Sequence, residues 1–116
     1  MTKLEDWAKR KCKPCEGGVA KLTIEQANQR MEALDDAWTL DEAAESIQRQ
    51  FEFRAFSRTI AFVNAVAWIA TVEGHHPELI VNYGSCHVMY RTHAINGLSD
   101  NDFICAAKID RLAEDL

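Results

Sequence analysis

The strongest candidate for chemistry is the segment Glu73-Gly74-His75-His76-Pro77, which carries two adjacent imidazoles. Imidazole gives and takes protons near neutral pH, so such a pair can serve general acid–base catalysis. Pro77 restricts its own backbone and favours an extended conformation at His76, which stiffens the loop. An exposed polar loop that happens to contain histidines is an equally simple interpretation of this segment alone.

His93 is the second candidate, because it follows a predicted strand, and strand-end loops often carry functional residues. A single histidine at such a place is more commonly structural. Three histidines can bind zinc with water as the fourth ligand, but adjacent loop residues rarely direct both rings at one ion. We therefore expect no metal site at His75, His76 and His93.

The four cysteines include one Cys-x-x-Cys pair, Cys12 and Cys15, in a polar arm that we assign to residues 1–21. A zinc site of this kind requires a second pair of ligands close by, and thioredoxin-type chemistry requires a strand before the motif and a helix after it. Neither condition is met, so we expect no chemistry there, and the role of the arm stays open. Cys86 and Cys105 are expected to be buried thiols that pack as small hydrophobic side chains.

The elements that must position these residues follow from hydrophobic periodicity and from capping signals. The box Thr23-x-x-Gln26 predicts a helix start, Gly74 predicts a helix end, and Gly84-Ser85 predicts a hairpin turn. The sequence thus predicts an α+β fold, a four-stranded antiparallel sheet with helices packed on one face. The expected helices are 24–34, 55–72 and one beginning after Ser99, and the expected strands are 38–40, 46–53, 79–83 and 87–92.

Two of these elements have unusual faces. Ile47, Phe51 and Phe53 share the apolar face of the strand 46–53, but Arg49 interrupts that face. The helix 55–72 has a wide apolar stripe, which suggests burial against the sheet or a subunit contact. Its expected inner residues are Phe56, Ile60, Val63, Ala67 and Ala70, with Phe62, Val66 and Ile69 widening the stripe.

Composition excludes several classes of protein. The 116 residues fit one domain, and 47% hydrophobic with 27% charged residues is ordinary for a globular chain. A net charge of −5, with only Lys9-Arg10-Lys11 as a basic cluster, argues against nucleic-acid binding. The longest apolar stretch, residues 60–72, is shorter than the roughly 20 residues that a membrane helix needs. Residues 1–6 lack an apolar leader, so we expect a cytoplasmic protein with no membrane partner.

Several motifs occur in a specific order along the chain. Thr92-His93 comes sixteen positions after His76-Pro77, and Gly97-Leu98-Ser99-x-x-Asp102 follows. Over about residues 22–112 this order resembles the pterin-4a-carbinolamine dehydratase family, so we assign residues 22–116 to a domain of that type. Other elements of the resemblance are Trp38, Phe51-Glu52-Phe53 with Phe56, Tyr83 and Val88.

The resemblance implies a reaction, the loss of water from 4a-hydroxytetrahydropterin to give quinonoid dihydropterin during tetrahydrobiopterin recycling. The reaction needs a proton delivered to the 4a-hydroxyl and a proton removed from N5, so it needs neither a metal nor an organic cofactor. The family also implies a homodimer or homotetramer. Carried over by position, the catalytic residues are His75, His76 and His93, and the substrate-binding residues are Trp38, Pro77, Thr92, Ala94, Ile95 and Asp102.

Some features leave alternatives open. Ala94 and Leu79 depart from an acidic and an aromatic residue found in family members, which affects expected substrate affinity more than the reaction. Asp102 can simply cap a helix, or it can also favour a charged imidazole. Some family members also bind a homeodomain transcription factor as dimerisation cofactors through the oligomer surface, and this is the alternative function that the resemblance implies.

Overall fold

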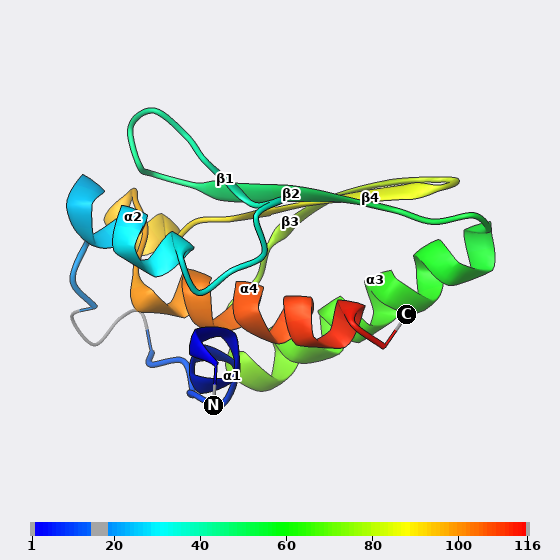
Figure 1. The fold of residues 1–116 in the computed structure, drawn as a ribbon, viewed down its shortest axis with the longest axis horizontal. Helices are drawn as coiled ribbons and strands as arrows, with labels where there is room; N and C mark the ends of the chain where they lie inside the picture. Colours follow the sequence, from blue (N-terminus) through cyan, green and yellow to red (C-terminus); the bar gives the residue numbers. More distant parts are fainter. Residues whose placement is uncertain (1, 15–18, 116) are drawn as a thin grey trace.

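The computed structural model describes residues 2–14 and 19–115, and its centre is a four-stranded antiparallel sheet (Figure 1). The strands lie in the order β1-β2-β4-β3, so β1 and β3 form the edges. All three pairings are antiparallel, which confirms the predicted α+β class. The strands are β1 (Thr39–Leu40), β2 (Ile47–Glu52), β3 (Glu78–Asn82) and β4 (Ser85–Tyr90).

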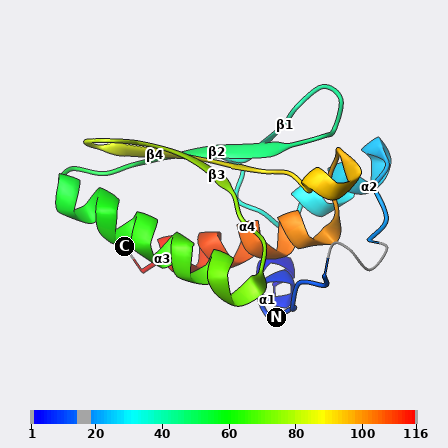
Figure 2. The ribbon, with the colours of Figure 1, turned by 180° about the vertical axis from the view of Figure 1, so that it is seen from behind.

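The long helices cover one face of this sheet, as predicted. Helices α3 (Phe56–Glu73) and α4 (Asp100–Ala113) run beneath it, and α2 (Ile24–Met31) lies near the end where β4 leaves the sheet (Figures 1 and 2). A 3-10 turn, η2 (His93–Ile95), connects β4 to α4. Among the residues described, no helix combines the length and apolar character needed to cross a membrane.

A short helix that we did not expect, α1 (Lys3–Ala8), lies in the segment assigned to the polar arm. It packs on the side of α4 that faces away from the sheet (Figure 2). The Trp7 ring meets Phe103 edge-on at 6.3 Å between centroids, and Lys108 Nζ donates to the Ala8 carbonyl at 2.6 Å. Six residues are too few to show helical periodicity, so the helix depends on this tertiary contact and on its cap, in which Thr2 Oγ1 accepts a hydrogen bond from the Glu5 N–H.

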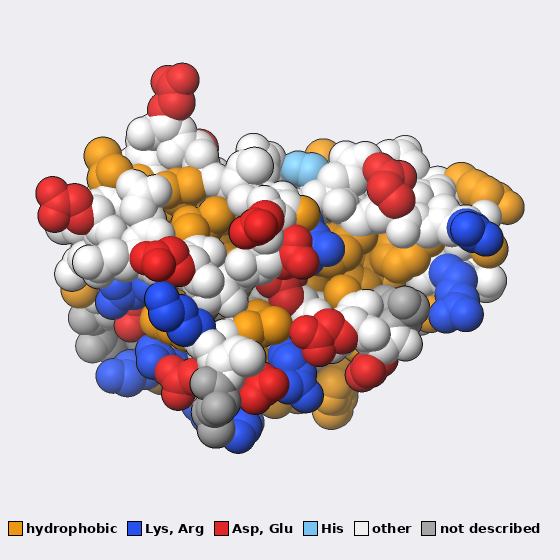
Figure 3. Space-filling model, viewed as in Figure 1, with side chains coloured by type: hydrophobic (Ala, Val, Ile, Leu, Met, Phe, Trp, Pro, Cys, Tyr) orange, Lys and Arg blue, Asp and Glu red, His pale blue; other side chains and the backbone are white. Residues whose placement is uncertain are grey.

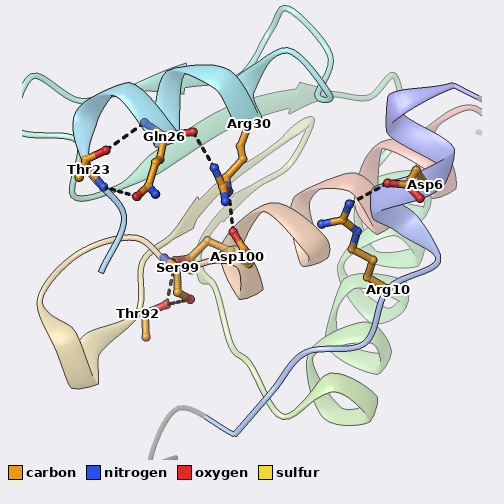
Figure 4. Close-up of polar contacts among 9 residues, drawn as sticks. Asp6, Arg10, Thr23, Gln26, Arg30, Thr92, Ser99 and Asp100 are labelled. Atoms are coloured by element: carbon orange, nitrogen blue, oxygen red, sulfur yellow. Dashed lines mark hydrogen bonds and ion pairs between the residues drawn. The ribbon is translucent and has the colours of Figure 1, made fainter. Parts of the chain in front are cut away.

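Two predicted caps are present. Thr23 Oγ1 accepts a hydrogen bond from the Gln26 N–H, and the Gln26 side chain accepts one from the Thr23 N–H (Figure 4). Gly74 closes α3 in the left-handed conformation, with φ of 66°, which glycine adopts without a steric cost. The start of α2 after Thr23 and the end of α3 at Gly74 are therefore where the sequence predicted them.

The inner face of α3 differs from the expected stripe. Thr59, Phe62, Val66 and Ala70 are buried, whereas Phe56 and Ala67 are exposed. Phe62, Val66 and Ala70 were expected to be buried, but the prediction was wrong for Phe56 and Ala67 and did not include Thr59, because apolar residues occur all around this helix and their pattern could not single out one face. The buried threonine is accommodated because its hydroxyl donates to the Tyr83 carbonyl at 2.8 Å.

The hairpin between β3 and β4 turns one residue earlier than predicted, at Tyr83-Gly84. The Phe53 N–H donates to the Gly84 carbonyl at 2.8 Å, which brings the two backbones into contact. A Cβ atom at Gly84 would lie 2.9 Å from the Phe53 carbonyl oxygen. This close approach accounts for glycine at the second turn position.

Arg49 has a partner within the chain, so its place in β2 does not by itself indicate a subunit contact. Its Nη1 lies 2.8 Å from Asp110 Oδ1, and its guanidinium lies over the Phe51 ring at 4.2 Å. Burial raises the pKa of Asp110, although hydrogen bonds from the Asp35 N–H and the Trp38 indole, together with the Arg49 charge, oppose that shift. The carboxylate thus needs the arginine to remain charged inside the fold.

We expect Arg49→Met to lower the free energy of unfolding by about 2 kcal/mol, since a hydrogen bond to a buried charged group is lost. Methionine keeps an apolar stem over Phe51, so the change isolates the charge. Urea denaturation measures the effect, with Gln50→Ala on the exposed side of β2 as the control. Equal stability of the two variants would show that the pair with Asp110 contributes little.

The surface mixes both signs of charge. On the face shown in Figure 3, acidic and basic side chains are interspersed, with hydrophobic side chains visible between them. The most exposed large hydrophobic residues include Trp68 and Tyr83, at 68% and 70%. They lie on α3 and in the β3–β4 hairpin.

Candidate active site

His75 is held rigidly at the exit of α3. Its N–H donates to the Ala70 carbonyl at 3.1 Å, directly after the left-handed Gly74. Its ring is buried and stacks on the Tyr90 ring of β4, with centroids 5.6 Å apart and planes 9° apart. Burial raises the pKa of Tyr90, so this phenol remains protonated against the imidazole. The structure therefore gives His75 one defined ring plane.

Asp102 completes a buried polar centre with His75. The His75 Nε2 atom lies 2.6 Å from Asp102 Oδ1. The other carboxylate oxygen accepts hydrogen bonds from Thr92 Oγ1 at 2.8 Å and from the Ser99 N–H at 3.0 Å. Asp102 is the third residue of α4, where the helix dipole favours a negative charge. The same carboxylate thus caps the helix and orients the imidazole.

The Thr92 and Ser99 hydroxyls, which point toward one another in Figure 4, form a chain that ends at this carboxylate. Their oxygen atoms lie 2.8 Å apart. Because Thr92 donates its proton to Asp102, the Ser99 hydroxyl is the donor to Thr92. Both side chains are fully buried, so these bonds are shielded from water.

This arrangement defines the protonation pattern of His75. A carboxylate only accepts hydrogen bonds, so the proton between Nε2 and Oδ1 belongs to the imidazole. In the neutral ring Nδ1 is then the nitrogen that carries no proton. A buried aspartate that orients an imidazole in this way is a recurring feature of catalytic acid–base groups.

The other two predicted histidines are exposed and adjoin this centre along the chain. His76 directly follows His75, and His93 directly follows Thr92 as the first residue of η2. Backbone hydrogen bonds between Thr92 and Gly97 close the loop, with Asn96 in the left-handed conformation. Of the other predicted contacts, Pro77 and Ile95 are half-buried and Ala94 is exposed.

Trp38 lies elsewhere in the core. It is 3% exposed, and its indole N–H donates to Asp110 Oδ1 at 2.7 Å. Asp110 is eight residues beyond Asp102 on α4, which corresponds to about 12 Å along a helix. The structure therefore packs Trp38 against the C-terminal half of α4 and does not join it to the hydrogen-bonded group of His75 and Asp102.

Two members of the centre were not predicted from the sequence. Ser99 was given only as a motif residue before the last helix, and Tyr90 only as part of the expected strand 87–92. The available signal was that Thr92 and Ser99 flank a short loop, which brings their side chains together. Among the residues described, no cluster of three or more histidine, cysteine or acidic side chains is arranged to hold a metal ion.

A cavity of about 890 Å³ lies beside the start of α4, but none of the three histidines lines it. Four basic side chains, Arg10, Lys11, Lys13 and Arg30, contribute to its wall. Arg30 Nε pairs with Asp100 at 2.6 Å (Figure 4). The group formed by His75 and Asp102 is a better candidate for the reactive site than this cavity, because acid–base chemistry requires groups that transfer protons near neutral pH.

Comparisons with known proteins place this geometry in a family. Residues 20–112 match the family described as pterin 4 alpha carbinolamine dehydratase. A protein of Nitrosomonas eutropha, provisionally named a pterin-4-alpha-carbinolamine dehydratase, is 54% identical over 112 residues and covers 97% of both chains. A protein of Legionella pneumophila with the same provisional name is 50% identical over 110 residues, 95% of this chain and 97% of its own.

Solved structures agree with the sequence relatives. A protein of Brucella melitensis described as a transcriptional coactivator/pterin dehydratase superposes with a TM-score of 0.76 at 33% identity, covering 81% of this chain and 99% of its own. A pterin dehydratase-like RuBisCO assembly factor of the alpha-carboxysome matches with a TM-score of 0.58 at 22% identity, over 66% of this chain and 89% of its own. That second likeness concerns the fold alone. With the match over residues 20–112 and these relatives, the chain belongs to the pterin 4 alpha carbinolamine dehydratase family.

Proposed function

We propose that this protein removes water from 4a-hydroxytetrahydropterin to form quinonoid dihydropterin, within tetrahydrobiopterin recycling in the cytoplasm. The observation that carries the proposal is the buried hydrogen bond between His75 and Asp102, which orients one imidazole at the site of the family motif. Provisional names of relatives at about 50% identity support the same reaction class.

The reaction requires two proton transfers. A proton must reach the 4a-hydroxyl group so that it leaves as water, and the N5 proton must be removed. We assign the base to His75, because the carboxylate of Asp102 stabilises the imidazolium that forms when Nδ1 takes up a proton. We assign the acid to His93 and a binding role to His76, since both are exposed and can reach a ligand.

The substrate contacts that we propose come from the two loops beside His75. Pro77 follows the histidine pair, and Thr92, Ala94 and Ile95 belong to the segment around η2. Asp102 acts on the substrate through His75. We leave Trp38 out of this set, because it is buried against Asp110 in the core.

The direct test is the rate at which 4a-hydroxytetrahydropterin disappears with and without purified protein. The compound is generated in situ by an aromatic amino acid hydroxylase, and quinonoid dihydropterin is followed by absorbance. Acceleration proportional to protein concentration supports the proposal. A rate equal to the uncatalysed one would overturn it and favour a binding role such as the dimerisation cofactor function of some family members.

We expect dialysis against a strong chelator to leave the dehydration rate unchanged, because both chemical steps are proton transfers. The rate before and after dialysis is the measurement, with metal content determined in parallel. Activity that is lost on dialysis and restored by one metal would contradict this expectation.

We also expect a dimer or tetramer in solution. Trp68 and Val72 of α3 are 68% and 51% exposed, and the edge strand β3 leaves Ile80 and Val81 exposed. Apolar surface of this kind is commonly covered by a second copy in homo-oligomers. Light scattering should give a multiple of 13.1 kDa, and Trp68→Glu should shift the mass toward a single chain. A single 13.1 kDa species for the unaltered chain at micromolar concentration would refute the assembly.

A further inference from the structure

The segment after α1 is bound to the opposite side of α4 from the sheet. The Cys12 N–H donates to Glu73 Oε1 at 2.9 Å, and the Glu73 side chain is only 4% exposed. Asn101 holds the next residue at two points, since its side chain accepts from the Lys13 N–H at 2.9 Å and donates to the Lys13 carbonyl at 2.7 Å. These bonds fix the backbone on both sides of the Cys12 side chain.

The consequence is a pair of thiols in contact. Cys12 Sγ lies 3.5 Å from Cys105 Sγ, although 93 positions separate the two residues in the sequence. A disulfide has sulfur atoms about 2.05 Å apart, so closure requires a movement of about 1.5 Å. Cys12 lies outside any helix or strand, so rotation of its side chain can supply that movement without disturbing α4.

We propose that Cys12 and Cys105 form a reversible redox modification site, which a small-molecule disulfide such as oxidised glutathione converts to an intrachain disulfide. Cys12 attacks the glutathione disulfide first, because it is half-buried whereas Cys105 is fully buried. Its sulfur displaces one glutathione thiol and gives a mixed disulfide. The Cys105 sulfur then displaces the second glutathione. The protein loses two protons and two electrons, and the oxidant becomes two thiols.

The Cys12–Cys105 pair lies close to the group formed by His75 and Asp102. Cys105 follows Asp102 by three residues on α4, so the two side chains lie on neighbouring positions of one helix face. The Cys105 thiol lies against the Tyr90 phenol, whose ring stacks on His75. A disulfide at this point would tie the N-terminal segment to the helix that carries Asp102.

The groups around the Cys12 thiol also predict how fast the disulfide forms. A hydrogen bond with Cys105 and burial raise the pKa of the Cys12 thiol, and the Glu73 carboxylate raises it further. Since only the thiolate attacks a disulfide, oxidation should be slow at neutral pH and faster as pH rises toward 9. This dependence separates the pair from an activated redox centre.

The test is incubation of the reduced full-length protein with oxidised glutathione at pH 8.5, followed by peptide mapping under non-reducing conditions. We expect a Cys12–Cys105 peptide pair with two hydrogens lost. The melting temperature should rise by about 5–10 °C, because the bond closes a long loop, and should return on reduction. Cys86→Ser and Cys15→Ser should keep both effects, whereas Cys12→Ser should remove both.

Further variants keep the test informative. Cys105→Ala preserves a small apolar side chain in the core and should also prevent the crosslink, with a folded far-ultraviolet spectrum as the control. A disulfide between Cys12 and Cys15, a stable glutathione adduct, or no reaction after prolonged incubation would each overturn the proposal. Stoichiometric zinc binding that requires both Cys12 and Cys105 would likewise overturn it, because the pair would then be a metal site.

Discussion

The His75→Ala variant should dehydrate 4a-hydroxytetrahydropterin about 10²–10⁴ times more slowly than the unaltered protein, the range expected for loss of a positioned general base. Its ring is buried, stacks on Tyr90 and donates to Asp102, so no neighbouring group can take the same position. Steady-state kinetics on the purified variant measure the effect. The loss should fall mainly on kcat, because the base acts in the chemical step.

Controls separate chemistry from folding. His75→Gln retains an amide that can donate to Asp102 but cannot act as a proton carrier, so it should be as slow as the alanine variant and better folded. His87→Ala changes the remaining histidine, on β4, and should keep near-normal activity. If His75→Gln kept most of its rate, the assignment of His75 as the base would be wrong.

The sequence predicted the longer helices, whose ends carry distinct capping residues, and missed the short helix α1. The box at Thr23 and the glycine at position 74 each marked a helix end that the structure confirms. Helix α1 is six residues long and is stabilised by contact with α4; the Thr2 cap is its local signal, but six residues show no periodicity to support that signal. The inner face of α3 was predicted only in part, since its apolar residues surround the helix: Phe62 and Val66 were expected to be buried, but Thr59 was not.

In the site, too, the order of the motifs predicted some residues, whereas others depend on how the chain packs. Motif order suggested His75, Thr92 and Asp102, and the structure joins these three by direct hydrogen bonds. The contribution of Ser99 depends on the fold of the loop after β4, which positions its hydroxyl against Thr92. Trp38 was assigned to substrate binding from the family resemblance, but its indole N–H donates to the buried carboxylate of Asp110.

Asp102→Ala should lower the free energy of unfolding by about 3–5 kcal/mol, because it leaves buried donors from His75, Thr92 and Ser99 without an acceptor. Denaturant unfolding measures this loss. Asp100→Asn is the matched control, since it removes one negative charge from the same helical turn at a half-exposed position. It should cost less than about 1 kcal/mol.

Asp102→Asn should separate the two roles of this carboxylate. The amide oxygen can still accept from Thr92 and Ser99, so the cap survives and the melting temperature should fall only slightly. The amide NH₂ then faces His75 Nε2 and favours the tautomer with the proton on Nδ1, which removes the lone pair assigned to the base. We expect kcat to fall about 10²-fold or more, with KM little changed. Nitrogen chemical shifts of the ring report the tautomer. An unchanged kcat with a slightly lowered melting temperature would leave Asp102 as a helix cap alone.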